Sequence, residues 1–143
     1  RRLSGGSVLS ATPFVLMVDD DEDDCMLART AFEACGAPGA FACIEDGGAL
    51  LHYLSRSPHP ALILLDINMP LMNGFEVLKE IKSIPAFRNI PVVIVSTSGE
   101  AEDMANCRKL GAESFLTKPS GFSDWVHMMK SLTDTWLEPS MYS

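Results

Sequence analysis

The chain has 143 residues, the length of one ordinary domain, so a single hydrophobic core must support whatever the protein does. Its formal net charge is −8, and six of its nineteen acidic residues lie together between Asp19 and Asp24. Because the chain has no Lys/Arg cluster, its charge argues against direct binding to nucleic acid or to an anionic membrane. An apolar content of 47% and short apolar runs exclude a disordered chain and a membrane span, so we expect a soluble, cytoplasmic domain.

Five short apolar runs alternate with segments of helical periodicity along the chain. The runs predict strands at Phe14–Val18, Ala40–Ile44, Ala61–Leu65, Pro91–Val95 and Ser114–Thr117. The periodic segments predict helices at Cys25–Ala34, Gly48–Ser55, Phe75–Ser83, Glu102–Leu110 and Phe122–Leu137. Runs that are apolar throughout are typical of parallel strands covered by helices on both faces. The sequence therefore predicts an α/β fold of the (βα)5 type, a doubly wound parallel sheet of five strands.

The four cysteines lie in apolar or helix-like contexts and form no CxxC pair, so the sequence contains no zinc knuckle or dithiol redox motif. We expect all four to be reduced core thiols, as is usual in a cytosolic protein. They are Cys25, Cys35, Cys43 and Cys107.

Polar side chains follow four of the predicted strands. Asp19 and Asp20 come after the first strand, Asp66 after the third, Ser96 after the fourth run and Lys118 after the fifth. Ligands of doubly wound sheets bind at the carboxyl ends of the strands, where the strand order reverses. We therefore expect three carboxylates, a hydroxyl and an ammonium to meet at one edge of the sheet.

Three carboxylates in one crevice repel one another, and Lys118 alone supplies too little positive charge to offset them. A divalent cation is implied, and oxygen ligands select a hard ion such as Mg²⁺. Asp19, Asp20 and Asp66 could bind it together with a backbone carbonyl near Asn68.

With a cation bound, Asp66 becomes a possible nucleophile, because a carboxylate can attack phosphorus to give an acyl phosphate. Ser96 can hydrogen-bond one phosphoryl oxygen, and Lys118 can pair with another. The residues therefore predict acceptance of a phosphoryl group on Asp66.

These motifs resemble those of the receiver domain of two-component response regulators, over nearly the whole chain from about Phe14 to Leu137. The resemblance implies the CheY-like, flavodoxin-like fold, with strand order 2-1-3-4-5. It rests on Met17-Val18-Asp19-Asp20, on Leu65-Asp66-Ile67-Asn68-Met69-Pro70 with Asn73-Gly74, on Val95-Ser96 and on Lys118-Pro119.

The resemblance also implies a role for each matching position. Asp66 is expected to be the phosphoacceptor, and Lys118 and Ser96 are expected to contact the phosphoryl group as catalytic residues. The expected Mg²⁺ ligands are Asp19, Asp20, Asp66 and the backbone carbonyl of Asn68.

Ser96 and Phe115 are the expected switch residues. Phe115 stands where the family often has Tyr, and because its ring lacks a hydroxyl the switch is expected to act by packing. The resemblance further implies a cis peptide bond between Lys118 and Pro119. Residues 84–91 and 96–98 resemble single-domain regulators paired with bacteriophytochrome-type histidine kinases.

The function implied is a signalling switch rather than an enzyme. It would receive its phosphoryl group from a sensor histidine kinase or a phosphotransfer protein and signal to a downstream protein, without contacting nucleic acid or membrane. A homodimer through the fourth helix, fifth strand and fifth helix is compatible with apolar residues of the last helix, namely Val126, Met129, Leu132, Trp136 and Leu137. Cover of the same residues by the chain's own tail is an equal alternative. We expect a flexible tail at 1–12, the receiver domain at 13–138 and a C-terminal tail at 139–143.

Simpler readings exist for part of the acidic run. Glu22, Asp23 and Asp24 are interpreted as solvated charges that favour the start of the first helix. Asp21 either caps that helix or contacts a metal-bound water.

Three other functions could use some of these residues. A haloacid-dehalogenase-like phosphatase would use Asp66 as nucleophile but needs a second acid two residues later, where this chain has Asn68. A flavodoxin-like FMN carrier is disfavoured, because the carboxylates would repel the flavin phosphate. A degenerate receiver that acts as a constitutive binding module remains open.

Overall fold

The computed structural model describes residues 13–69, 73–97 and 99–137. The predicted tails at 1–12 and 139–143, together with Pro70 and Ser98 of the quoted motifs, lie outside the described residues. The strands are β2 (Phe14–Val18), β3 (Ala40–Ile44), β4 (Leu62–Leu65), β5 (Val92–Ser96) and β6 (Ser114–Thr117). The helices are α1 (Glu22–Ala34), the 3₁₀ turn η1 (Gly47–Ala49), α2 (Leu50–Arg56), α3 (Gly74–Ser83), α4 (Ala101–Lys109) and α5 (Phe122–Trp136).

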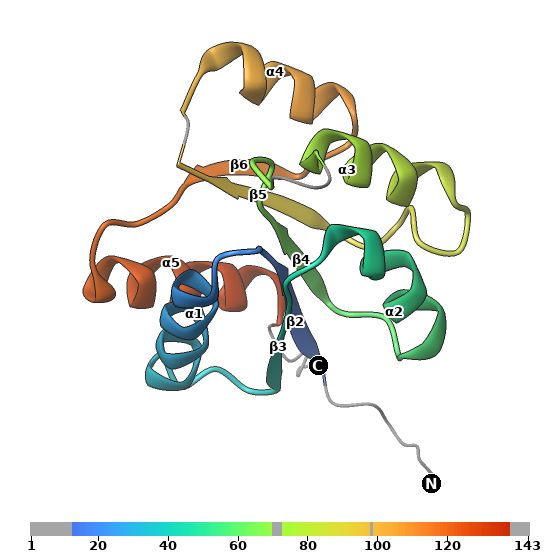
Figure 1. The fold of residues 1–143 in the computed structure, drawn as a ribbon. Coiled ribbons are helices and arrows are strands. Elements are labelled where there is room, and N and C mark those ends of the chain that lie inside the picture. Colours follow the sequence, from blue (N-terminus) through green and yellow to red (C-terminus); the bar gives the residue numbers. More distant parts are fainter. Residues whose placement is uncertain (1–12, 70–72, 98, 138–143) are drawn as a thin grey trace, which may run out of the picture.

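The described strands form one parallel sheet in the order β3-β2-β4-β5-β6 (Figure 1). Counted along the chain this is the order 2-1-3-4-5, so the predicted fold is confirmed. The order reverses at β2, because the chain first crosses to β3 on one side and then returns to β4 on the other.

The sheet separates two apolar clusters. Along β2, Leu16 and Val18 face one cluster, and Val15 and Met17 face the other. The first cluster includes buried residues of α2, α3 and α4, and the second includes buried residues of α1 and α5. Figure 1 accordingly shows α1 and α5 on one side of the sheet and the other three helices on the opposite side. This double cover explains why the strands are apolar throughout.

The apolar residues expected on the surface of the last helix are largely part of the core. Met129, Leu132 and Leu137 are buried in the cluster beneath α1 and α5. Val126 and Trp136 are partly buried against the same cluster. These five side chains therefore give no independent argument for a dimer face.

The loop that follows β4 is fixed by a close backbone contact. A Cβ atom on Gly74 would collide with the backbone of Ile67 and with the carbonyl oxygen of Asp66. Asn73 caps α3 at the same place, since its side chain accepts a hydrogen bond from the amide of Phe75 at 2.7 Å. The start of α3 therefore packs directly on the residues that follow β4.

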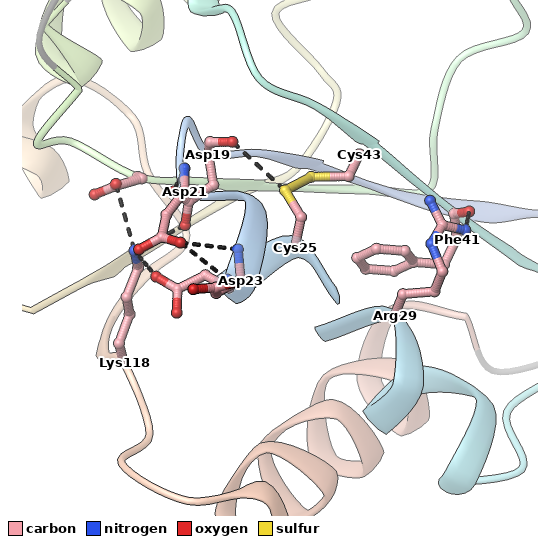
Figure 2. The surroundings of a disulfide bond; sticks show 10 residues. Asp19, Asp21, Asp23, Cys25, Arg29, Phe41, Cys43 and Lys118 are labelled. Carbon is pink, nitrogen blue, oxygen red and sulfur yellow. Dashed lines mark hydrogen bonds and ion pairs between the residues drawn. A yellow bond between two sulfur atoms is a disulfide. The ribbon is translucent and has the colours of Figure 1, made fainter. Parts of the chain in front are cut away.

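The prediction of four reduced thiols is wrong for two of them, because Cys25 and Cys43 form a disulfide (Figure 2). Cys25 lies in the first turns of α1 and Cys43 lies on β3, with 6.2 Å between their Cα atoms. Cysteines in two different elements, 18 residues apart, leave no local motif, and only the packing of the helix on the strand brings them within disulfide distance.

The other two cysteines are thiols, as predicted. Cys107 is buried, and this burial, with a smaller contribution from the charge of Asp103, raises the pKa of its thiol to about 11. Over the ranges that the structure describes, none of the helices is long and apolar enough to cross a bilayer.

Candidate functional site

The carboxyl ends of the strands bring together the side chains that the sequence singled out. The amide of Asp66 donates to the carbonyl of Val18 at 3.0 Å, which continues the pairing of β2 with β4. The amide of Lys118 donates to the carbonyl of Ser96 at 2.7 Å, which ties the end of β6 to β5. These backbone bonds place the residues after β2, β4 and β6 and the last residue of β5 around one point, next to the position where the strand order reverses.

Three carboxylates form the centre of the site. Oxygen atoms of Asp19, Asp20 and Asp66 all lie within 4.8 Å of one another. Asp19 is fully buried and Asp66 is 6% exposed, whereas Asp20 is exposed to solvent. The cluster is therefore buried on one side and accessible from water on the other.

Lys118 is the cation that these carboxylates share. Its Nζ atom lies 2.8 Å from Asp19 Oδ2, 2.7 Å from Asp24 Oδ2 and 3.4 Å from Asp66 Oδ2. Burial by itself would lower the pKa of Lys118, but its short contacts with Asp19 and Asp24, together with the negative charges of Asp19 and Asp66, raise it above its ordinary value. The amine is therefore a permanent positive charge near neutral pH.

Asp19 has one oxygen fixed and one available. Its Oδ1 atom accepts a hydrogen bond from the amide of Asp21 at 2.9 Å. Its Oδ2 atom is ion-paired with Lys118 but accepts no well-directed hydrogen bond from the described residues. Burial raises the pKa of Asp19 to about 6; Lys118 and the Asp21 amide oppose this shift, and the charge of Asp66 adds to it. A buried carboxylate oxygen without an aligned donor, beside two further carboxylates, suits a hard divalent cation.

The carboxylate of Asp66 is held on both sides. Its Oδ1 atom accepts a hydrogen bond from the amide of Asn68 at 3.0 Å, and its Oδ2 atom faces Lys118. The side-chain amide of Asn68 in turn donates to the hydroxyl oxygen of Ser96 at 2.9 Å. Asn68 therefore connects the carboxylate at the end of β4 to the buried hydroxyl at the end of β5.

Phe115 lies on β6, three residues before Lys118, and pairs in register with Ile94 of β5. Its ring is partly buried against the cluster beneath α2, α3 and α4. This places it beside the strand that carries Ser96, on the side of the sheet away from α1 and α5.

The acidic residues that follow Asp20 have three different roles: a helix cap, solvated charges and a partner of Lys118. Asp21 caps α1, since its Oδ1 atom accepts from the amides of Asp23 at 2.9 Å and Asp24 at 3.3 Å. Glu22 and Asp23 are exposed, as expected for solvated charges. Asp24 contradicts that interpretation, because its carboxylate pairs with Lys118 inside the site.

Sequence reasoning missed Asp24, although a signal for it exists. Asp24 lies four residues before Ala28 and seven before Ala31, both of which are buried on the inner face of α1. Residues at this spacing share one face of a helix. An acid in the first turn on the inner face, above the strand ends, would have pointed to the site.

The expected cis bond before Pro119 is also wrong, since the part of the chain that the structure describes contains no cis peptide. The trans form is the more stable isomer of an X-Pro bond, by about 0.5–1 kcal/mol. Lys118 reaches its three carboxylates in that form.

A doubly wound sheet with an acidic cluster and a lysine at the strand ends defines the CheY-like class of domain. The chain belongs to the response regulator receiver domain family, whose model matches residues 15–130. Receiver domains are signalling switches that are not generally classed as enzymes. They bind Mg²⁺ at an acidic cluster and interact with histidine kinases and downstream targets.

Relatives of the chain include FilR2, a probable methanogenesis regulatory protein of Methanothrix harundinacea. It is 36% identical over an alignment that covers 94% of this chain and 92% of FilR2. The response regulator Rcp1 of Synechocystis is 33% identical over 87% of this chain and 88% of its own length.

Solved structures agree with the fold. The Mn²⁺-bound form of Rcp1 matches with a TM-score of 0.79 and 32% identity, over 89% of this chain and 96% of Rcp1. The phosphorylated cyanobacterial phytochrome response regulator RcpA matches with a TM-score of 0.82 and 32% identity, over 90% and 96% of the two chains.

Proposed function

We propose that the chain accepts a phosphoryl group on Asp66 from a histidine kinase or a phosphotransfer protein. The observation that carries this proposal is the environment of one carboxylate: Asp66 lies between the amide of Asn68 at 3.0 Å and Lys118 Nζ at 3.4 Å, within 4.8 Å of two further acids. Hydrogen bonds fix the direction of the nucleophile, and the ammonium faces the charge that develops during transfer.

In the proposed reaction an oxygen of Asp66 attacks the phosphorus of a phosphohistidine. A P–O bond forms as the P–N bond breaks, and the imidazole leaves with the electron pair and takes a proton from solvent. Lys118 pairs with one phosphoryl oxygen and offsets its negative charge. Ser96 donates its hydroxyl hydrogen to another.

The site suits Mg²⁺, which Asp19, Asp20 and Asp66 would hold together with the backbone carbonyl of Asn68. The buried Oδ2 atom of Asp19 is the specific observation behind this assignment. When bound, Mg²⁺ supplies positive charge to the phosphoryl oxygens. The Mn²⁺-bound form of Rcp1 and the phosphorylated RcpA are relatives whose structures support the proposal by likeness.

The proposed switch begins at the hydrogen bond between Asn68 and Ser96. The Ser96 hydroxyl must turn toward the phosphoryl group, and this leaves Phe115, on the neighbouring strand, as the residue that repacks. The result is a changed surface for a downstream protein, and we also propose the cytoplasm as the place of action. A phytochrome-type kinase as donor and a homodimer through α4, β6 and α5 are parts of the same proposal.

The proposed function does not include catalytic turnover of external substrates. The position that would need an acid for phosphatase chemistry is Asn68, whose amide is engaged with Ser96 and has no basic or acidic group to offer. We expect only slow loss of the protein's own phosphoryl group.

Intact mass tests the proposal after incubation with acetyl phosphate or phosphoramidate, with and without Mg²⁺. The wild type should gain one phosphoryl group, about 80 Da, only when Mg²⁺ is present. Asp66→Asn should gain none under the same conditions. A wild type that stays unmodified while it binds Mg²⁺ would instead indicate a constitutive binding module.

A further inference from the structure

We propose that Asp24 is a positioning residue that holds Lys118 toward α1 and competes with the phosphoryl group for its ammonium. This inference rests on the proposed acceptance of a phosphoryl group by Asp66. Its consequence is that Asp24 makes the phosphorylated state less stable than it would otherwise be.

The argument begins with the distances around Lys118. Asp24 Oδ2 is its nearest carboxylate oxygen at 2.7 Å, and Asp66 Oδ2 is the most distant of the three at 3.4 Å. The Lys118 side chain is 9% exposed and that of Asp24 is 22% exposed. A charge-assisted hydrogen bond so shielded from solvent is stronger than an ordinary surface ion pair.

Asp24 stands outside the carboxylate cluster that suits a cation. That cluster consists of Asp19, Asp20 and Asp66, so a bound divalent cation would take up the charge of two of the three partners of Lys118. The charge of Asp24 would remain, with Lys118 as its partner. The pair of Asp24 and Lys118 is therefore the one expected to persist in the metal-bound state.

Asp24 cannot follow the amine toward Asp66. Its backbone amide donates to the capping carboxylate of Asp21. The next residue, Cys25, is buried, is bonded to Cys43 and lies with its sulfur 3.5 Å from the carbonyl oxygen of Asp19 (Figure 2). The first turn of α1 is thus fixed on the sheet, and the amine must leave Asp24 to approach Asp66 closely.

A phosphoryl group on Asp66 would compete with Asp24 for the ammonium of Lys118. It brings more negative charge than the carboxylate that it replaces, together with strong acceptor oxygens. The ammonium has three N–H donors to divide among its acceptors. Each donor that stays with Asp24 is withheld from the phosphoryl group, and the carboxylate of Asp24 adds like-charge repulsion.

The test uses beryllium fluoride with saturating Mg²⁺ as a probe of the phosphorylated state, and measures the dissociation constant by titration calorimetry or ¹⁹F NMR. Asp24→Asn should bind the probe about tenfold more tightly than the wild type, the scale of one charge-assisted hydrogen bond. Asp24→Glu restores the charge and should return the affinity toward the wild-type value. Damage to the fold would weaken binding, so tightening is a signature that a merely structural role does not produce.

Two controls isolate the contact. Asp23→Asn removes the same charge from an exposed neighbour in the first turn and should leave the affinity unchanged. In a Lys118→Ala background, Asp24→Asn should keep only the smaller effect of removing like-charge repulsion, because the ammonium for which Asp24 and the phosphoryl group compete is gone.

The possible failures are distinguishable. If the wild type binds beryllium fluoride and Asp24→Asn binds it equally or more weakly, Asp24 does not compete for Lys118, and the proposed function stands. If the wild type binds no probe and gains no phosphoryl group on Asp66, the proposed function and this inference are both wrong.

Discussion

The side-chain amide of Asn68 donates a hydrogen bond to the hydroxyl of Ser96 at 2.9 Å, while its backbone amide donates to Asp66 at 3.0 Å. One residue therefore binds both the proposed phosphoacceptor and the proposed switch hydroxyl. Only the bond to Ser96 uses the side chain of Asn68, which carries no charge. The side chain at this position therefore determines whether a water molecule near an acyl phosphate on Asp66 has a general base beside it.

Asn68→Asp should accelerate the loss of the phosphoryl group from Asp66 by about tenfold or more, because a carboxylate can act as a general base toward water and an amide cannot. The rate is measured by intact mass over time after the phosphoryl donor is removed. Asn68→Ala serves as the control, since it removes the hydrogen bond to Ser96 without adding a base. Equal rates for the two variants, or a slower rate for Asn68→Asp, would contradict the prediction.

Asp19→Asn should stabilise the metal-free protein at pH 8. Burial raises the pKa of Asp19 from its ordinary value of 3.8 to about 6, so the protonated form is favoured by folding. The associated stability is fully present below about pH 4 and is lost as the pH rises through about 6. Above that pH the ionised carboxylate of Asp19 lowers the free energy of unfolding by about 2–3 kcal/mol, and an uncharged Asn avoids this loss.

Urea denaturation in EDTA at pH 4 and pH 8 tests this prediction. The two proteins should have similar free energies of unfolding at pH 4, and the variant should be the more stable at pH 8. Added Mg²⁺ should stabilise the wild type more than the variant, which lacks one proposed ligand. A variant less stable than the wild type at pH 8 would show that Lys118 favours the charged form more than burial opposes it.

Much of the fold could be predicted because its signals are local. Three strands, Phe14–Val18, Ala40–Ile44 and Ser114–Thr117, have the predicted bounds, since each is bounded by Pro, Gly or a charged residue. Helix α1 begins at Glu22, three residues before the predicted start, because Asp21 caps it and the acidic first turn carries no apolar periodicity.

Most of the candidate site could also be predicted from the sequence, because its residues directly follow predicted strands. Parallel strands deliver their carboxyl ends to one edge, so Asp19, Asp66 and Lys118 could be brought together without any knowledge of side-chain geometry. Asp24 and the Cys25–Cys43 disulfide depend on how α1 is rotated against the sheet. For Asp24 the sequence holds only an indirect signal of this rotation, its spacing to Ala28 and Ala31 on the inner face of α1. The approach of Cys25 to Cys43 is set by tertiary packing and leaves no local pattern.

Gly74→Ala should destabilise the protein by about 1–3 kcal/mol or more, because a Cβ atom there would collide with the backbone of Ile67 and with the carbonyl oxygen of Asp66. Gly121→Ala is the matched control: its Cβ would meet nothing within 4 Å, and its φ of −138° suits any residue. Chemical denaturation of both variants gives the comparison. Similar stabilities would mean that α3 can move away from the loop after β4 at little cost.

Reduction of the disulfide should lower the free energy of unfolding by about 3 kcal/mol, the loop-closure value for a cross-link over this sequence separation. The bond between Cys25 and Cys43 ties α1 to β3 across 18 residues, so its loss enlarges the unfolded ensemble while the native packing stays in place. Denaturation of the wild type with and without a phosphine reductant measures the difference, and intact mass under denaturing alkylation verifies reduction.

The variant with Cys25→Ser and Cys43→Ser is the control. It should match the reduced wild type, and its free energy of unfolding should change with reductant by less than the experimental error. A fully reduced wild type as stable as the oxidised form would show that helix packing alone fixes the start of α1.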